Sequence, residues 1–385
     1  MPKHIAVASF SKSGGPGTVS SALIASFRYE GHEVSELWKV EKSLRESPTR
    51  SLSLSARAAI DEYVIKNKAF GPPISVERRA SRNLFEKGGT FDCAVLGWLP
   101  GLLTDEDFGF LSDTPTAIRL PDQNPFTGAC HYSVGCDSFV AGCQGCPAVR
   151  VFARGMVERS LEKKIRNYQR LNKKLFIAPS DWIAGLAKAS LALKDERVHV
   201  VRNPISKTFF KPQKAPKFDQ MTILFAASQV FDPVKGFTNL AGALNRMASN
   251  QSVRVRVAGN AGKKQKEFPH IEFLGRLSPY QLAMEYERAW VTIVPSISET
   301  SGNVVGESLA SGTPVLARRI DGLAETASLV DERFLFQSDS ELIERLDSLD
   351  LRSFHKISKD LTEVARIHDP TVVANRYLSL LEGIR

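Results

Sequence analysis

The chain has 385 residues, and 51 Lys and Arg against 42 Asp and Glu give a formal net charge of +9. This length exceeds one ordinary hydrophobic core and suits two domains. The charge favours anionic partners. No nucleic-acid-binding motif is present, so no nucleic-acid partner is expected. No apolar run approaches the ~20 residues of a membrane-spanning helix.

The first half opens with a predicted strand at 4–10, a loop containing Gly14 and Gly15, and a helix at 18–30. A strand at 32–37 completes a βαβ unit. Because a glycine-rich loop follows the first strand directly, the N-terminus does not resemble a signal peptide, and a cytoplasmic protein is expected. Glycine lets a backbone approach a ligand closely, although a tight strand–helix turn would also explain this pair.

Strands and helices continue to alternate along the chain, apart from a polar, poorly patterned stretch at 45–90. Further strands are expected at 91–99, 114–120, 174–180, 198–204, 222–228, 253–259, 271–275, 289–296 and 333–336, and further helices at 161–174, 181–193, 237–248, 278–289 and 370–384. Asn203–Gln220 contains three prolines and is interpreted as a linker. The predicted fold class is α/β, with two doubly wound parallel sheets.

The most informative stretch is 291–317, where seven residues separate Glu299 from Glu307. Glu299 follows a buried strand, and Glu307 lies in a helix that begins near Asn303. Ligands of open α/β sheets bind outside the carboxyl ends of the strands. One carboxylate could therefore hold sugar hydroxyls and the other a ribose, while helix amides near Asn303 and Val304 meet phosphate. Two surface glutamates at an exposed helix start are the alternative.

Three other strand ends carry candidate ligand-binding residues. Lys235 precedes a helix, where an ammonium can contact a diphosphate, although a solvated loop lysine is the alternative. Asn260 and Gly275 follow strands near the expected base pocket. The triplet 105–107 imitates an Asp-x-Asp metal motif, but we interpret it as an acidic helix start.

Four of the five cysteines lie between residues 130 and 146. Cys143 and Cys146 have the spacing of a zinc knuckle, whereas Cys130 and Cys136 are more widely spaced. We predict a structural zinc ion, with four reduced thiols as the alternative. Downstream, 150–174 holds nine basic residues against two glutamates. This stretch could contact an anionic membrane or simply form a solvated helix.

Together these phrases resemble the family 4 retaining glycosyltransferases, which have the GT-B fold. The resemblance rests on Glu299, Glu307 and the phrase Gly312-Thr313-Pro314-Val315, on Lys235-Gly236, and on Gly14-Gly15. The cysteine stretch resembles a subgroup that assembles bacterial exopolysaccharide or O-antigen, including colanic acid. Two positions depart from the family: Pro121-Asp122 replaces a His-Asp pair, and Gln229 replaces an arginine.

The resemblance implies an N-terminal domain at 1–203, a linker at 204–218, a C-terminal donor domain at 219–368, and a helix at 369–385 that returns to the first domain. The active site would lie in the cleft between the domains and need no catalytic metal. Glu299, Asp122 and His131 are the candidate catalytic residues, with His131 standing in for the missing histidine. A nucleoside-diphosphate sugar is the expected donor and a glycan or lipid-linked molecule the acceptor. A non-catalytic nucleotide-sugar-binding protein and an epimerase of the same fold remain alternatives.

Overall fold

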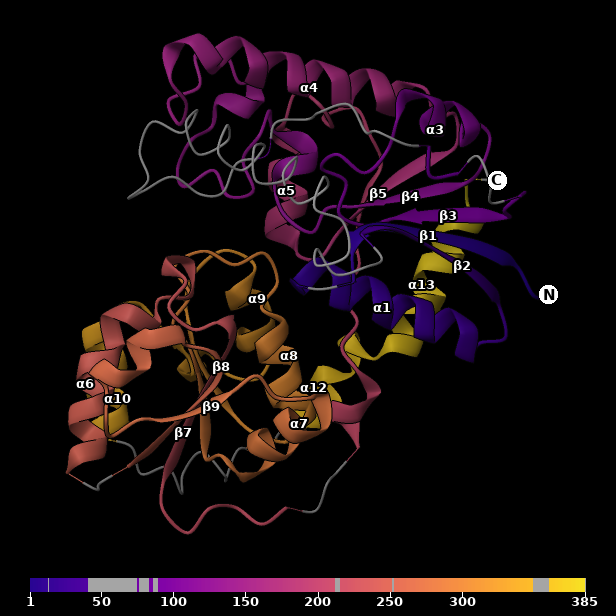
Figure 1. The fold of residues 1–385 in the computed structure, drawn as a ribbon. Helices are drawn as coiled ribbons and strands as arrows, with labels where there is room; N and C mark the ends of the chain where they lie inside the picture. Colours follow the sequence, from indigo (N-terminus) through magenta and orange to yellow (C-terminus); the bar gives the residue numbers. More distant parts are fainter. Residues whose placement is uncertain are drawn as a thin grey trace. The chain divides into compact units, whose positions relative to one another are not determined.

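The computed structural model describes residues 1–12, 14–40, 75, 83–85, 89–211, 215–250, 253–348 and 360–384. Most of the polar stretch 45–90 therefore lies outside the described residues. Contacts divide the chain into two units (Figure 1): Met1–Val201 together with Ala374–Arg385, and Arg202–Val373. Among the described residues, no helix has the length and apolar character needed to cross a membrane.

The first unit is built on a six-stranded parallel sheet in the order β2-β1-β3-β4-β5-β6. Its strands are β1 (His4–Ser11), β2 (Glu33–Val40), β3 (Cys93–Leu96), β4 (Thr116–Arg119), β5 (Lys174–Ala178) and β6 (Val198–Val200). Its helices are α1 (Gly14–Tyr29), α3 (Asp105–Phe110), α4 (Arg154–Gln169) and α5 (Asp181–Ala189). Helices α3, α4 and α5 share one core with the sheet, and α1 covers the opposite face (Figure 1).

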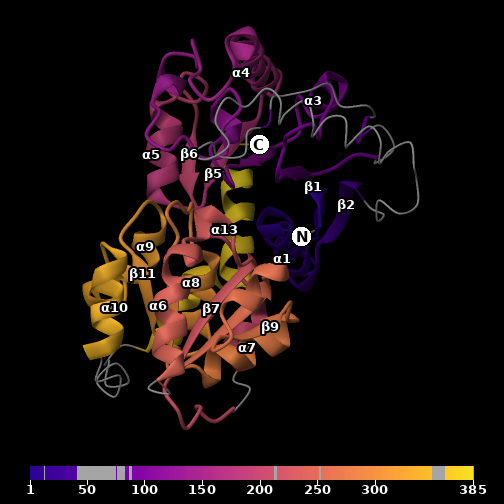
Figure 2. The same cartoon turned by 60° about the vertical axis from the view of Figure 1, so that its left-hand side comes forward.

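The second unit repeats this plan with the strand order β12-β11-β10-β7-β8-β9. Its strands are β7 (Thr222–Gln229), β8 (Arg254–Asn260), β9 (Glu272–Gly275), β10 (Val291–Val294), β11 (Val315–Arg318) and β12 (Leu335–Phe336). Its helices are α6 (Phe237–Ser249), α7 (Pro279–Arg288), α8 (Asn303–Ala310), α9 (Leu323–Ser328), α10 (Asp339–Ser348) and α12 (Leu361–Ala365). Helices α7, α8, α9 and α12 pack in one core, and α6 and α10 pack in another. Helices α6 and α10 lie side by side (Figure 2).

The strand orders confirm the predicted doubly wound parallel sheets. In each sheet the first strand, β1 or β7, lies between strands that belong to the two directions of winding. Such a switch point leaves an opening at the carboxyl ends of the two neighbouring strands, because the connections leave toward opposite faces. In the second unit, β7 and β10 are these neighbours.

Two predicted helix boundaries are wrong. Helix α1 begins at Gly14 rather than residue 18, because the glycines and Pro16 form its first turn, where proline is well tolerated. Helix α4 covers 154–169 rather than 161–174, because the chain turns at Arg170 and Lys174 already begins β5. The expected linker includes a 3₁₀ turn at Lys207–Phe210, and Phe209 is buried in the second core.

Helix α13 (Pro370–Glu382) ends the chain and crosses the boundary between the two units. Just before it, buried His368 accepts the amide of Ile205 on its carbonyl at 3.1 Å. The His368 ring nitrogen Nδ1 lies 2.8 Å from the Asn203 carbonyl oxygen. The two segments that lead out of the second unit are therefore bonded to each other.

Candidate functional site

Lys235 and Glu299 meet at the switch point of the second unit. Lys235 ends a turn that Asp232 caps through the Val234 amide, at 3.0 Å. The loop after β10 is joined to this turn, because the Ile297 amide donates to the Val234 carbonyl at 2.9 Å. Lys235 Nζ then lies 2.6 Å from Glu299 Oε2. Burial works to lower the Lys235 pKa, but the carboxylate outweighs burial and raises the pKa above its ordinary value.

Asp321, just after β11, holds the Glu299 loop from the other side. Its carboxylate accepts the Ser298 hydroxyl at 2.7 Å and the Glu299 amide at 3.3 Å. Burial raises the pKa of Asp321. The sequence analysis did not identify this residue. Its left-handed backbone, with φ of 44°, is a feature that only the structure shows.

Two helix N-termini border the ion pair, and each is preceded by a glycine with positive φ. Gly236 caps α6 and Gly302 caps α8, with φ of 70° and 64°. A Cβ on Gly236 would run into the Pro295 carbonyl. Asn303 and Val304 form the first turn of α8 and are half-buried, as a phosphate-binding turn requires.

Glu307 lies one turn further along α8 and is bound by a residue that the sequence analysis missed. The Tyr286 hydroxyl donates to Glu307 Oε2 at 3.0 Å. Tyr286 is fully buried in the second core. Burial raises the pKa of Glu307 to about 7, although the Tyr286 hydrogen bond opposes the shift. Glu307 is thus held at a fixed position on α8.

The candidate base-binding residues lie at neighbouring strand ends. Asn260 is exposed at the end of β8, and its amide donates to the Gln229 side chain at 3.0 Å. Gln229, which replaces an arginine of the resembled family, therefore faces Asn260. Gly275 ends β9 with φ of 69° and is exposed.

In the first unit, Asp122 and His131 form a buried pair. Asp122 Oδ2 lies 2.7 Å from His131 Nδ1 and also accepts the Trp98 indole at 3.1 Å. The other ring nitrogen of His131 lies 2.9 Å from the Ser75 hydroxyl. Both ring nitrogens are thus engaged by protein groups, so the structure brings the two predicted residues together.

Gly14 and Gly15 lie in the first turn of α1, and a Cβ on either would meet open space. Gly14 has φ of 79°, which a residue with a side chain rarely adopts, and a Cβ on Gly17 would run into the backbone of Ser11 and Lys12. The sequence analysis missed Gly17, because close approach of a helix to its own preceding strand has no signal beyond the glycine itself.

Cys130, Cys136, Cys143 and Cys146 line one pocket together with Phe139 and Val157. Burial and the neighbouring thiols raise the pKa of Cys130 to about 12, and burial also raises that of Cys143 and Cys146. In the parts of the chain that the structure describes, no three His, Cys, Asp or Glu side chains stand in an arrangement ready to hold a metal ion. The zinc expectation therefore stays a prediction.

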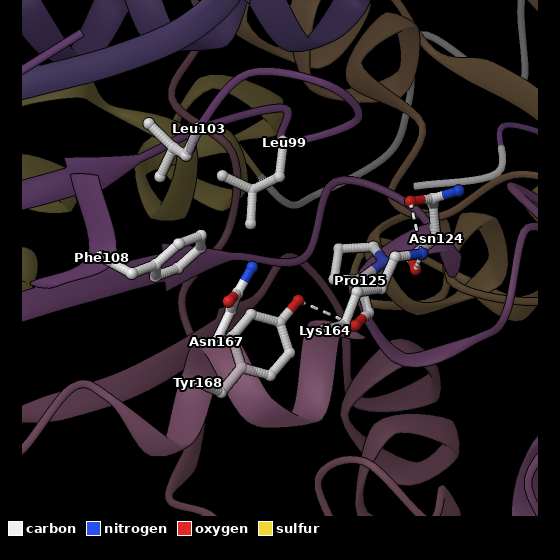
Figure 3. A pocket seen from close by; sticks show the side chains of 8 residues that line it. All are labelled: Leu99, Leu103, Phe108, Asn124, Pro125, Lys164, Asn167 and Tyr168. Atoms are coloured by element: carbon white, nitrogen blue, oxygen red, sulfur yellow. Dashed lines mark hydrogen bonds between the residues drawn. The ribbon is translucent and has the colours of Figure 1, made fainter. Parts of the chain in front are cut away.

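A second pocket of the first unit lies beside α4 (Figure 3). Lys164 is buried there and donates to the Asn124 carbonyl at 2.7 Å and the Thr127 carbonyl at 3.0 Å. Tyr168 donates to the Pro125 carbonyl at 2.9 Å. These bonds attach the loop after β4, which carries Asp122, to α4.

Comparison with solved structures gives the fold class: the chain has the two-domain GT-B fold. It is similar over 99% of its length to sucrose-phosphate synthase from Thermosynechococcus elongatus, with a TM-score of 0.65, 17% identity and 98% of that chain covered. It is similar over 99% of its length to Anabaena HepE in complex with UDP and glucose, with a TM-score of 0.60, 14% identity and 100% of that chain covered.

Sequence comparison points to the second unit. Residues 220–349 match the family model "Glycosyl transferases group 1". The D-inositol 3-phosphate glycosyltransferase of Corynebacterium glutamicum is 34% identical over 116 residues, which cover 29% of this chain and 27% of that protein. The chain thus spans about a quarter of the length of this relative. The matched family segment contains Lys235, Glu299, Glu307 and their partners.

Proposed function

We propose that this protein is a retaining glycosyltransferase that moves a sugar from a nucleoside-diphosphate sugar to an acceptor. One observation carries the proposal: Lys235 and Glu299 pair at 2.6 Å at the switch point of the unit that matches the glycosyl transferase model. The N-terminus of α8 lies in the same loop as Glu299. A cation, a carboxylate and free helix amides at one strand edge suit a diphosphate joined to a sugar.

In this proposal the diphosphate displaces Glu299 from Lys235. Negative charge develops on the leaving diphosphate, and Lys235 with the α8 amides stabilises it, so no catalytic metal is required. The freed Glu299 carboxylate then accepts hydrogen bonds from sugar hydroxyls. Glu307, fixed by Tyr286, holds the ribose. Asn260 and Gly275 border the base.

Retention of the anomeric configuration is proposed on the resemblance to family 4. A retaining hydrolase places a second carboxylate as nucleophile. In this proposal Glu299 holds the sugar hydroxyls and Glu307 the ribose, while Asp321 accepts the Ser298 hydroxyl and the Glu299 amide, so no carboxylate of this edge stands out as a nucleophile. A same-face transfer, in which the leaving phosphate accepts the acceptor's proton, therefore fits better. Asp122 and His131, the other two catalytic candidates, form a buried pair in the first unit, where Asp122 also accepts the Asn124 amide of the loop after β4.

For the acceptor, we propose a glycan or lipid-linked molecule of bacterial polysaccharide synthesis, handled in the cytoplasm at the inner membrane face. Helix α4 and its flanks supply the positive charge for contact with anionic lipid, with Arg150, Arg159, Arg166 and Arg170 exposed. Binding of the protein to lipid vesicles, with an affinity that rises with their anionic lipid content, would support this membrane contact.

The test is donor binding followed by donor turnover. A thermal-shift panel of UDP-, GDP- and ADP-sugars should single out one donor, because a ligand that binds only the native state raises the melting temperature. UDP-sugars come first, since UDP is bound in the HepE structure. Slow release of free sugar and nucleoside diphosphate is then expected. Binding without release would instead favour the non-catalytic protein, and an epimerised donor would favour the epimerase.

A further inference from the structure

Four thiols from three turns of one loop region converge on a single pocket in the first unit. Cys130, Cys136, Cys143 and Cys146 line it, and none of them is in a disulfide. Phe139, Pro147 and Val157 supply apolar walls. The remaining cysteine, Cys93, is buried in β3 and takes no part.

Backbone amides are already directed at two of these sulfurs. The Gly128 amide donates to Cys143 Sγ at 3.2 Å, and the amides of Ala148 and Val149 hydrogen-bond to Cys146. Amides directed at a sulfur hold it in a fixed orientation, as hydrogen bonds from surrounding groups do for metal ligands. A neutral thiol sulfur is only a weak acceptor, so it needs no such set of donors.

The backbone around Cys143 and Cys146 adopts left-handed conformations, which are unfavourable for a residue with a side chain. Cys143 has φ of 60°, which is rare for a residue with a side chain, and Gly142 and Gly145 on either side also have positive φ. The turn points both thiols of the pair into the pocket. A strained backbone conformation persists only where other interactions stabilise it, and a ligand bound by both sulfurs would supply such an interaction.

We propose that Cys130, Cys136, Cys143 and Cys146 bind one Zn²⁺ ion as a structural site. Four sulfur–zinc bonds form, four thiol protons leave to solvent, and no oxidant is needed. The sulfurs are not yet in ligand geometry, so zinc binding requires the thiols to turn inward about their Cα–Cβ bonds. Cys130 and Cys136 are half-buried. His131 is excluded as a ligand, because Asp122 and Ser75 engage both its nitrogens.

Zinc follows from the donor set, since four thiolates select zinc or an iron–sulfur centre over hard cations. The site carries a formal charge of −2, and Lys164 and Arg154 are the nearby cations that offset it. An ion here would join the Cys130 segment, the Cys143–Cys146 turn and, through Gly128, the loop attached to α4. The site stabilises the first unit and stands independently of sugar transfer.

The test uses the full-length protein, purified under reducing conditions without a metal-affinity column. Elemental analysis should find about one zinc per chain. A Cys143→Ser/Cys146→Ser double variant should lose the zinc, whereas Cys93→Ser, the matched control, should keep it. Cobalt substitution of the wild-type protein should give the intense absorption of thiolate–metal charge transfer.

Thiol accessibility supplies a second readout that does not depend on any variant folding. With zinc bound, all four thiols should resist a thiol reagent until a chelator is added, and the chelator should lower the melting temperature. A free Cys136 would behave differently, because this half-buried thiol would react without a chelator. Prompt reaction of Cys136, or wild-type zinc content no higher than that of the double variant, would overturn the proposal. Stoichiometric iron would overturn the assignment of the ion.

Discussion

Lys235 and Glu299 form an ion pair in the ligand-free chain, with 2.6 Å between Lys235 Nζ and Glu299 Oε2 and with both side chains partly exposed. An ion pair in this setting contributes on the order of 1 kcal/mol. A diphosphate offers Lys235 two or more negative oxygens, so it competes well with a single carboxylate. The pair keeps the site charge-balanced without a ligand and releases both groups when one arrives.

We expect Lys235→Ala to weaken nucleoside-diphosphate binding by ~1.5–3 kcal/mol, the usual worth of a charged hydrogen bond. Glu299→Gln should have the opposite effect on the diphosphate alone, tightening it by about 1 kcal/mol, because the competitor for Lys235 is gone. The same variant should lose donor turnover. Calorimetric titration measures the affinities, with exposed Lys194→Ala as the control. Equal affinity in the wild type and Lys235→Ala would remove the phosphate role.

Glu307 predicts a pH dependence of stability. Its pKa is raised to about 7 in the folded chain from an ordinary value of 4.5. The stabilisation is therefore complete below pH 4.5 and is lost as the pH rises through 7, by ~1–3 kcal/mol for a partly exposed carboxyl. Urea unfolding of both proteins should show that the free energy of unfolding of the wild type falls relative to that of Glu307→Gln between pH 5 and pH 8.

The control for this measurement is Glu267→Gln, which removes an exposed carboxylate in the same unit. A pH-independent difference between wild type and Glu307→Gln would show that the buried carboxyl does not titrate in this window. Tyr286→Phe should raise the pKa of Glu307 further, because the hydroxyl that stabilises the Glu307 carboxylate would be absent.

At the residue scale, the sequence predicted Lys235 and Glu299 in loops after strands and Glu307 in the helix that follows, but it did not identify Tyr286 or Asp321. Lys235 and Glu299 lie directly after β7 and β10, so the order of elements places them together. Tyr286 and Asp321 reach the same edge from α7 and from beyond β11. Their contacts depend on sheet order, which no local pattern encodes.

Among the elements, the turn before α6 depends on a single glycine. Gly236 has φ of 70°, and a Cβ there would run into the Pro295 carbonyl at the end of β10. We expect Gly236→Ala to cost roughly 1–2 kcal/mol for the left-handed backbone. The displaced β10 loop should add about 1–3 kcal/mol.

Gly262→Ala is the matched control, because Gly262 also has positive φ, at 58°, but nothing lies within 4 Å of its Cβ position. It should cost only the backbone part, ~1–2 kcal/mol. Denaturant unfolding and diphosphate affinity of the two variants separate strain from collision. Equal losses in both would show that the β7 and β10 loops adjust freely.

Periodicity located most of the strands and helices that the structure describes, because buried strands and amphipathic helices differ in apolar spacing. Helices α9, α10 and α12 were not predicted. Ends were less certain. The start of α1 at Gly14 was not predicted, because glycine and proline usually indicate a loop, whereas here they form the first turn of the helix. Helix α4 was placed seven residues late, since its first turn follows the 3₁₀ turn at Val151–Ala153 without a capping side chain.

For the whole molecule, α13 matters because most of it belongs to the first unit. Tyr377 and Leu381 are buried, Tyr377 bonds with Arg119 of β4, and Glu382 pairs with Lys3. Deleting residues 370–385 should destabilise the first unit by several kcal/mol, since each buried large side chain contributes ~1.5–3 kcal/mol.

Hydrogen exchange read separately in β1–β6 and β7–β12 checks this, because the loss of protection should be larger in the first sheet, to whose unit residues 374–385 belong. Tyr377→Phe, which removes only the bond to Arg119, should cost about 1 kcal/mol. Unchanged melting temperature and donor affinity in the truncated chain would show that the helix is dispensable.

The return of α13 also decides how the molecule would respond to mechanical tension. Both chain ends belong to the first unit, while residues 202–373 form a single insertion whose two exits are joined through His368, Asn203 and Ile205. A pull on the two termini stretches the first unit alone, and no force reaches the insertion until that unit yields. Optical-tweezer traces should therefore show two ordered ruptures, the first releasing the flanking residues and the second the inserted ones.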